Sequence, residues 1–231
     1  MKRYWYVGCA LALIASVAFL KAATLPPTGG TEAKSMLREI LRANARFAKR
    51  NGAGHFKAFA ESQSPSATVL CCSDSRVQMQ AIDEDPDNRL FVVRNIGNQL
   101  ATSEGSVEYG VRHLHTPLLL IVGHVRCGAV KAASGEYAHE SPELRRELDT
   151  LKVPNGGDWL EGVRHNVNHQ VKAAAEMFSP EVKAGSLTIV GAIYDFADDL
   201  KSGYGRLVVI NVNGETDPAR VAALAGEPEG R

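Results

Sequence analysis

The sequence predicts an α/β protein with a central, mostly parallel β-sheet of four to five strands, flanked by helices and preceded by an N-terminal helical arm. Two observations support this fold class. Strand-like and helix-like segments alternate along the chain, which favours a layered α/β architecture. The strand-like segments are continuously apolar, as at 118–122 and 187–190, and this pattern is typical of strands covered on both faces.

The elements follow from local patterns. A helix is expected at 32–49, where Met36, Ile40 and other apolar residues recur at helical spacing. It would pack either on its own domain or on a second subunit. Strands are predicted at about 67–72, 89–94, 117–123, 187–193 and 206–212, and helices at about 103–115, 127–134, 142–151 and 158–178. The last strand follows a short connection and is predicted as an antiparallel edge.

The first residues have the pattern of a secretory signal. Lys2 and Arg3 precede an apolar stretch at 7–20, and small residues follow at 22–23. This stretch is short for a membrane span, which needs about 20 residues. A cleaved signal, giving a periplasmic or secreted protein, is therefore preferred to an uncleaved membrane anchor. The predicted organisation is a signal or anchor at 1–23, a linker and N-terminal helix at 24–50, an α/β domain carrying the candidate site at 51–215, and a C-terminal tail at 216–231.

The charge composition favours a small-molecule partner. Lys plus Arg and Asp plus Glu number 26 each, and no block of like charge occurs in the chain. We therefore expect no nucleic-acid partner and, for the mature chain, no membrane partner.

Two segments at the ends of predicted strands carry the candidate site: 72–76, with the sequence CSDSR, and 124–127, with the sequence HVRC. Ligands in open α/β sheets bind beyond the carboxyl ends of the strands, so the two segments can meet there. The thiolates of Cys72 and Cys127 and the imidazole of His124 are ligands that Zn²⁺ prefers. Three protein ligands leave a fourth position open, as in catalytic zinc sites.

A charged pair is expected beside these ligands. In an extended segment, Cys72, Asp74 and Arg76 point to one side, and the carboxylate and guanidinium should pair. The alternative is an ordinary ion pair at a strand end. Gly123 and Gly128 flank the second segment and are expected to permit a tight backbone turn. Without the first segment, His124 and Cys127 would be read as a polar loop residue and a small buried apolar residue.

Together these segments resemble those of the β-class carbonic anhydrases, and the similarity extends over about 37–212. Further similar motifs are Asn44-Ala45-Arg46-Phe47, Arg94-Asn95-Ile96-Gly97-Asn98, Ser106-Val107-Glu108-Tyr109 and Gly191-Ala192-Ile193-Tyr194-Asp195. The resemblance implies zinc on Cys72, His124 and Cys127, and reversible hydration of CO2 to bicarbonate and a proton by a zinc-bound hydroxide. It also implies a homodimer or homotetramer.

The resemblance gives Asp74 two possible roles. As a catalytic residue it accepts a hydrogen bond from the hydroxide while Arg76 holds it in place; in some family members the aspartate instead becomes a fourth metal ligand. Members that close in this way are similar in a bicarbonate-binding trio, of which Arg94 and Tyr194 match here but Val69 replaces a tryptophan. We therefore expect the site to stay open near neutral pH.

Several alternatives stay open on the sequence. A related zinc hydrolase of CS2 or COS would use the same zinc ligands, and a non-catalytic zinc-binding or thiol redox protein would leave Asp74 and Arg76 unexplained. Gln99, Tyr109 and His55 are candidates for pocket or proton-relay residues, and the sequence does not choose among them.

Overall fold

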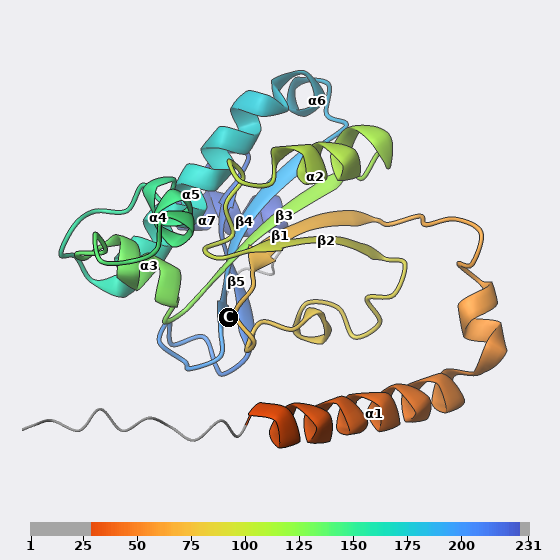
Figure 1. Ribbon diagram of the computed structural model, residues 1–231. Helices are drawn as coiled ribbons and strands as arrows, with labels where there is room; N and C mark the ends of the chain where they lie inside the picture. Colours follow the sequence, from red (N-terminus) through yellow and green to blue (C-terminus); the bar gives the residue numbers. More distant parts are fainter. Residues whose placement is uncertain (1–28, 227–231) are drawn as a thin grey trace, which may run out of the picture. The chain divides into compact units, whose positions relative to one another are not determined.

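The computed structural model describes residues 29–226 (Figure 1). The predicted signal at 1–23 lies outside the described residues. The chain divides into a unit that ends at Phe56 and a unit that begins at Lys57. In the second unit the strands are β1 (Ala67–Cys72), β2 (Leu90–Asn95), β3 (Leu118–His124), β4 (Thr188–Asp195) and β5 (Arg206–Val212). Its helices are α2 (Glu104–Glu108), α3 (Gly128–Ala133), α4 (Pro142–Asp149), α5 (Trp159–Met177), α6 (Ser179–Lys183) and α7 (Pro218–Ala225).

The five strands form one sheet in the order β2-β1-β3-β4-β5. The first four are parallel, and β5 pairs antiparallel with β4 at the edge. The predicted fold class and the antiparallel edge strand are thus confirmed. The chain runs from β1 to β2 on one side and then crosses back to place β3 on the other side of β1. This reversal makes the carboxyl ends of β1 and β3 a topological switch point, which is where ligands bind in sheets of this kind.

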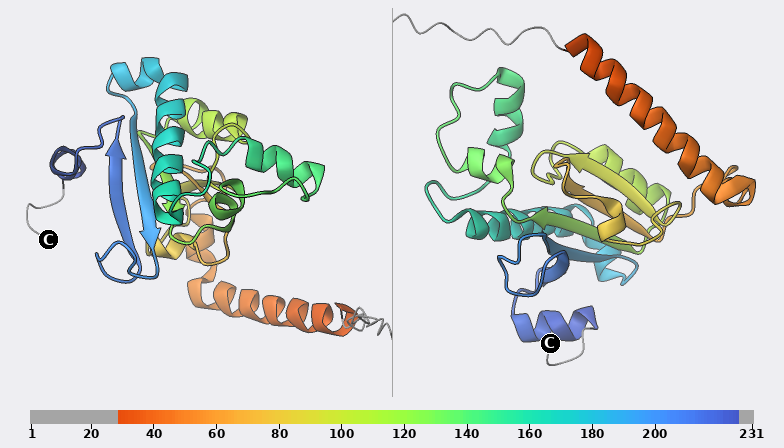
Figure 2. Two further views of the ribbon diagram at one scale, coloured as in Figure 1. Left: turned by 90° about the vertical axis from the view of Figure 1, so that its left-hand side faces the viewer. Right: turned by 90° about the horizontal axis from the view of Figure 1, so that it is seen from below.

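One face of the sheet packs against helices. Figure 2 shows α5 lying along β4, and the main apolar cluster joins strand residues such as Leu70 and Ile121 to Val171 of α5 and Val107 of α2. The opposite face carries a second apolar cluster that includes Val69. In the described part of the second unit, this cluster contains only strand residues and the segment 77–82.

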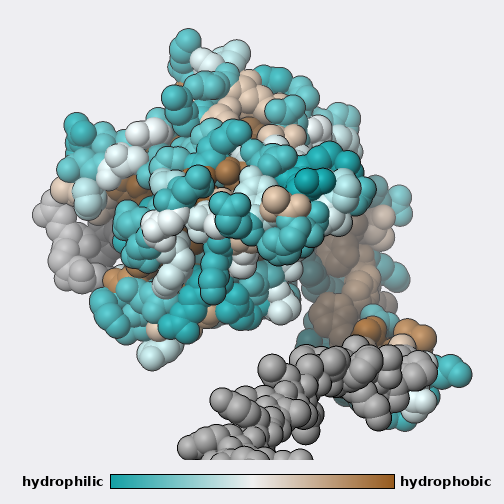
Figure 3. Space-filling view, turned by 60° about the vertical axis from the view of Figure 1, so that its left-hand side comes forward, coloured by the Kyte–Doolittle hydropathy of each residue, from teal (hydrophilic) through white to brown (hydrophobic). Residues whose placement is uncertain are grey.

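Helix α1 (Gly29–Lys57) confirms the predicted N-terminal helix and extends it, with a non-helical backbone at Gly52. Its apolar residues are exposed in the single chain and show as brown atoms in Figure 3. They include Met36, Leu37, Ile40 and Leu41, each more than half exposed. None of the described helices is both long and apolar enough to cross a membrane.

Two differences from the sequence prediction have local causes. The helix expected at 103–115 is α-helical only to Glu108 and continues as a π-helical turn at Tyr109–His113. The segment predicted as a tail contains α7, whose start is marked by Asp217, which caps the amide of Arg220, and by Pro218 in the first turn. This Asp-Pro signal is readable in the sequence.

Candidate metal centre

The three predicted ligands come together at the ends of β1 and β3. Cys72 is the last residue of β1, His124 is the last residue of β3, and Cys127 immediately precedes α3. Their ligand atoms, two sulfurs and a ring nitrogen, lie within 4.8 Å of one another, and all three residues are buried. The sequence predicted this meeting point, because both segments follow predicted strands and ligands bind beyond the carboxyl ends of strands in such sheets.

The ring of His124 is oriented for metal binding. Its Nδ1 lies 2.9 Å from the carbonyl oxygen of Val125. A hydrogen bond to a carbonyl requires the proton on Nδ1, so Nε2 carries the lone pair. That Nε2 is fully buried and has no hydrogen-bond partner among the described residues. A buried nitrogen lone pair beside two sulfurs matches the ligands of a tetrahedral zinc site. Zn²⁺ therefore fits these residues.

The two cysteines differ in their tendency to ionise. The nearby side chains of Cys127 and His124, together with the amide of Gly97, which donates to the sulfur, outweigh burial and lower the pKa of Cys72 to about 4. The contact with Cys72 and burial raise the pKa of Cys127, while amides at the start of α3 oppose this increase. The opposite shifts favour one thiolate in this pair before metal binds, and the remaining thiol must lose its proton when both sulfurs become ligands.

The turn between His124 and Cys127 depends on Arg126. This residue adopts φ of 56°, a left-handed conformation that is uncommon outside glycine. Gly123 and Gly128, expected to permit the turn, do not have positive φ. Gly123 instead allows close helix packing, because a Cβ there would lie 2.5 Å from a methyl group of Val167.

Asp74 and Arg76 form the predicted pair next to the ligands. The guanidinium donates from Nε to Oδ1 at 2.9 Å and from Nη2 to Oδ2 at 2.7 Å, and the amide of Arg76 also donates to Oδ1. These hydrogen bonds hold the pKa of Asp74 well below its usual range, despite partial burial. Oδ2 lies 3.8 Å from Nε2 of His124, so the carboxylate faces the metal ligands.

Arg94 holds the backbone of the first segment. Its guanidinium donates hydrogen bonds to the carbonyl oxygens of Cys72, Asp74 and Val77 at 2.7–3.1 Å. The other two positions of the sequence-derived trio lie on the sheet face opposite α5. Val69 and Tyr194 both belong to the apolar cluster there.

The other sequence candidates have partners of their own. Gln99 is fully buried and bonds to Ile96, Glu147 and Thr150. Tyr109 stacks on His113, and His55 contacts Phe47 and Phe56. None of these contacts involves a metal ligand.

Sequence reasoning missed the residues that surround Arg76. The ring of Phe196 lies 4.5 Å from the guanidinium carbon of Arg76, and Asp199 pairs with Arg126. Phe196 and Asp199 come from the loop after β4, more than 60 residues after Arg126 in the sequence. Of the residues in and before this loop, only Asp195 belongs to a motif that the sequence analysis identified. Phe196 and Asp199 lie in no local pattern that could have identified them.

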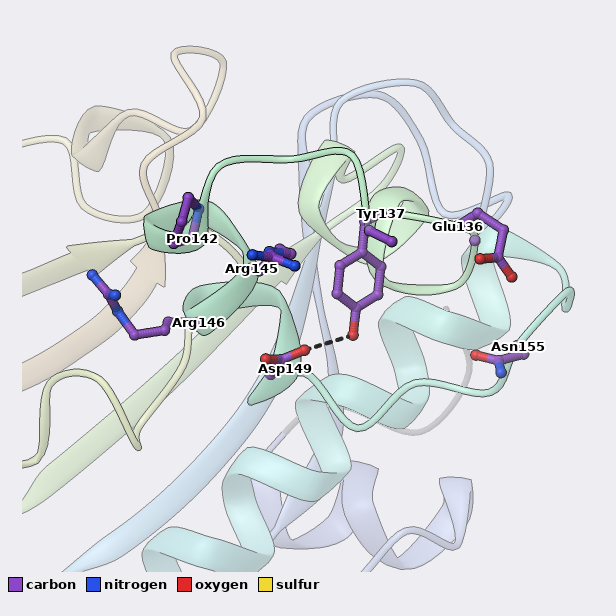
Figure 4. A pocket seen from close by; sticks show the side chains of 9 residues that line it. Glu136, Tyr137, Pro142, Arg145, Arg146, Asp149 and Asn155 are labelled. Atoms are coloured by element: carbon purple, nitrogen blue, oxygen red, sulfur yellow. Dashed lines mark hydrogen bonds between the residues drawn. The ribbon is translucent and has the colours of Figure 1, made fainter.

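A surface cavity of about 590 Å³ lies between α4 and the loops that precede and follow it (Figure 4). Its walls carry charges of both signs, including Arg145, Arg146 and Glu136, and Tyr137 donates a hydrogen bond to Asp149. None of the metal ligands lines it, so it does not form part of the site.

Comparisons with known proteins agree with this site. A family model described as carbonic anhydrase matches residues 67–201, which is more than half of the chain and contains all three ligands. The chain belongs to the carbonic anhydrase family. Among relatives, carbonic anhydrase 2 of Mycobacterium tuberculosis is 30% identical over 158 residues, covering 62% of this chain and 76% of that protein. A carbonic anhydrase of Pseudomonas aeruginosa is 29% identical over 198 residues, covering 75% and 88%.

Solved structures of β-carbonic anhydrases share the fold. A tetrameric enzyme of Sordaria macrospora matches with a TM-score of 0.65 at 20% identity, covering 78% of this chain and 98% of that chain. The Coccomyxa enzyme, in complex with acetazolamide, matches with a TM-score of 0.63 at 24% identity, covering 81% and 91%. The family membership, the β-class fold and the Cys-His-Cys cluster identify zinc as the cofactor of this carbonic anhydrase.

Proposed function

We propose that this chain catalyses the reversible hydration of CO2 to bicarbonate and a proton. The observation that carries the proposal is the joint placement of three zinc ligands and an ion-paired carboxylate at one strand edge. The membership of the carbonic anhydrase family supports the same reaction. A non-catalytic zinc protein would have no use for a carboxylate fixed beside its ligands.

The zinc ligands and the Asp74–Arg76 pair have separate roles in the proposed reaction. Cys72, His124 and Cys127 would hold zinc, which when bound would supply a Lewis acid that lowers the pKa of a water molecule towards neutrality. Asp74 keeps its charge because Arg76 donates to both of its oxygens. Oδ1 accepts from both the amide and Nε of Arg76, whereas Oδ2 accepts only from Nη2 and keeps a lone pair. Through Oδ2, Asp74 can accept a hydrogen bond from the attacking oxygen and orient it.

We propose that Asp74 stays paired with Arg76 near neutral pH rather than binding the metal. The two-point hydrogen bond and the lowered pKa of Asp74 favour the pair. Val69, in place of the tryptophan of the bicarbonate-binding trio, supports the same state. A crystal structure of the zinc-loaded protein at pH 7.5 tests this, since Asp74 on the metal with Arg76 unpaired would contradict it.

Two variants separate metal binding from catalysis. Cys127→Ala removes a ligand, so we expect loss of zinc together with loss of CO2 hydration. Asp74→Ala leaves all three ligands, so we expect retained zinc and a rate reduced by about a hundredfold, the scale of a lost general-base or orienting group. Metal analysis and stopped-flow hydration of the same samples give both readouts. Full activity in Asp74→Ala would remove this residue from the mechanism.

We propose that the protein is a homodimer or homotetramer. Two apolar surfaces support this: the exposed side of α1, including Met36 and Ile40, and the sheet face that carries Leu118 and Val190. Contiguous apolar surface of this kind marks protein interfaces. The related enzyme of Sordaria macrospora is described as tetrameric.

We further propose that the protein is exported to the periplasm or secreted, because residues 1–23 have the composition of a signal. N-terminal sequencing of the protein from the periplasmic fraction should give a chain that begins near residue 24. Full-length chain in the membrane fraction would favour the uncleaved anchor instead.

A further inference from the structure

We propose that the loop at 195–200, which follows β4, positions the Asp74–Arg76 pair, with Phe196 and Asp199 as its positioning residues. The proposal rests on the proposed function, because it assigns these residues to the same reaction. Neither residue is a metal ligand or contacts one of the ligand atoms in a hydrogen bond. Both act through the two arginines that lie beside the metal ligands.

The loop is fixed by a buried carboxylate at its base. Asp195 is fully buried, and its two oxygens accept hydrogen bonds from the backbone amides of Ala197, Asp199 and Leu200 at 2.7–3.1 Å. A carboxylate bonded to three amides holds the loop in one conformation. The carbonyl oxygen of Asp195 also accepts a hydrogen bond from Gly205 at 2.7 Å, which closes the loop toward β5.

Phe196 supports the guanidinium of Arg76. The guanidinium carbon lies 4.5 Å from the centre of the Phe196 ring, within the range of a cation–π contact. The side chain of Arg76 is 46% exposed, so its own packing does little to fix it. The centre of the Phe196 ring also lies 6.1 Å from the centre of the His124 ring.

Asp199 holds Arg126, whose carbonyl oxygen is a second hydrogen-bond acceptor for Arg76. Its carboxylate receives two hydrogen bonds from Arg126, at 3.0 and 3.1 Å. The carbonyl oxygen of Arg126 in turn accepts a hydrogen bond from Nη2 of Arg76 at 3.2 Å. Because Arg126 has a left-handed backbone, this side-chain pair helps to hold an uncommon conformation between His124 and Cys127.

Arg76 therefore has three supports: Asp74, the carbonyl oxygen of Arg126, and the ring of Phe196. The loop fixes the last two. Without them, the side chain of Arg76 can turn toward solvent and leave Asp74 held only by the backbone amide of Arg76. The reaction should then slow while the zinc ligands stay in place.

The first test compares Phe196→Leu with Phe196→Tyr in the zinc-loaded, full-length protein. Leucine keeps an apolar side chain but removes the ring, so we expect kcat to fall about tenfold, the scale of a partly buried cation–π contact. KM and zinc content per chain should change by less than about twofold, because neither depends on the orientation of Arg76. Phe196→Tyr restores a ring and should recover most of the lost rate. Asp199→Asn should lower kcat by about threefold, since the arginine of its pair with Arg126 is more than half exposed.

A matched control and a double-mutant cycle distinguish positioning from general destabilisation. Phe91→Leu makes the same change at a half-buried ring that contacts Tyr109, away from the metal ligands, and should leave kcat unchanged. In an Arg76→Gln background, Phe196→Leu should have little further effect on kcat, because the residue acts through Arg76.

The outcomes are separable. A wild type at the buffer rate would refute the proposed function itself. An active wild type whose Phe196→Leu variant keeps its kcat would overturn the positioning role alone. An equal loss of rate in the Arg76→Gln background, or equal losses in Phe196→Leu and Phe196→Tyr, would also overturn it.

Discussion

At the scale of single residues, the metal centre depends on side chains in which one atom makes a hydrogen bond within the protein while another faces the metal position. Nδ1 of His124 is bonded to Val125, which leaves Nε2 for a metal. The carboxylate of Asp74 is bonded to Arg76 and still faces the ligands. The ligand types and their places after apolar strands were predictable from sequence, because they depend on local pattern. The orientation of the His124 ring was not, because it depends on the turn that follows.

Asp195 gives a prediction at the same scale. Burial opposes its ionisation, but the amide hydrogen bonds outweigh burial, so its pKa is lowered in the folded state. Its contribution to stability is therefore fully present above the ordinary Asp pKa of about 4 and is lost as the pH falls through the lower, folded-state value. We expect Asp195→Asn to cost about 1–3 kcal/mol at pH 7.

Urea unfolding of the metal-free wild type and Asp195→Asn at pH 7 and pH 3.5 measures this. The stability difference between the two proteins should shrink at the lower pH. A difference that is the same at both pH values would show that the charge of Asp195 contributes nothing.

At the scale of elements, the metal ligands meet because β1 and β3 are neighbours although β2 lies between them in sequence. The continuously apolar strand segments predicted the parallel sheet. The motifs at 72–76 and 124–127, at the ends of two of these strands, predicted the metal site. The loop at 195–200 could not be found in this way. Phe196 meets Arg76 only because β4 lies beside β3, a pairing that no local pattern encodes.

The packing of α5 on β3 and β4 gives an element-scale prediction. A Cβ at Gly123 would lie 2.5 Å from Val167, and one at Gly191 would lie 2.8 Å from Val167 and Val171. We expect Gly123→Ala and Gly191→Ala each to lower the free energy of unfolding by about 1–3 kcal/mol, because α5 must shift outward.

Gly105→Ala is the matched control for these variants, since a Cβ there meets no atom within 4 Å. Thermal or urea unfolding of the three variants gives the comparison. Equal stability of all three would contradict the close approach of α5 to the sheet.

At the scale of the whole molecule, exposed apolar surface predicts assembly. Ile40→Glu places a charge on the apolar side of α1 and should shift the protein toward smaller species in light scattering after gel filtration. Arg38→Glu introduces the same residue at a polar position of α1 and should keep the wild-type mass. A monomeric wild type would contradict the proposed oligomer, and an unchanged mass for Ile40→Glu would show that this helix is not part of the interface.

The central claim is that this chain hydrates CO2 at a zinc centre that is open near neutral pH. Stopped-flow hydration of CO2 at pH 7.5, with the zinc content of the wild-type sample measured at the same time, tests it most directly. We predict about one zinc per chain, as in a site with three protein ligands, and a rate well above the buffer blank. A fully zinc-loaded protein that hydrates CO2 no faster than the blank would contradict the claim.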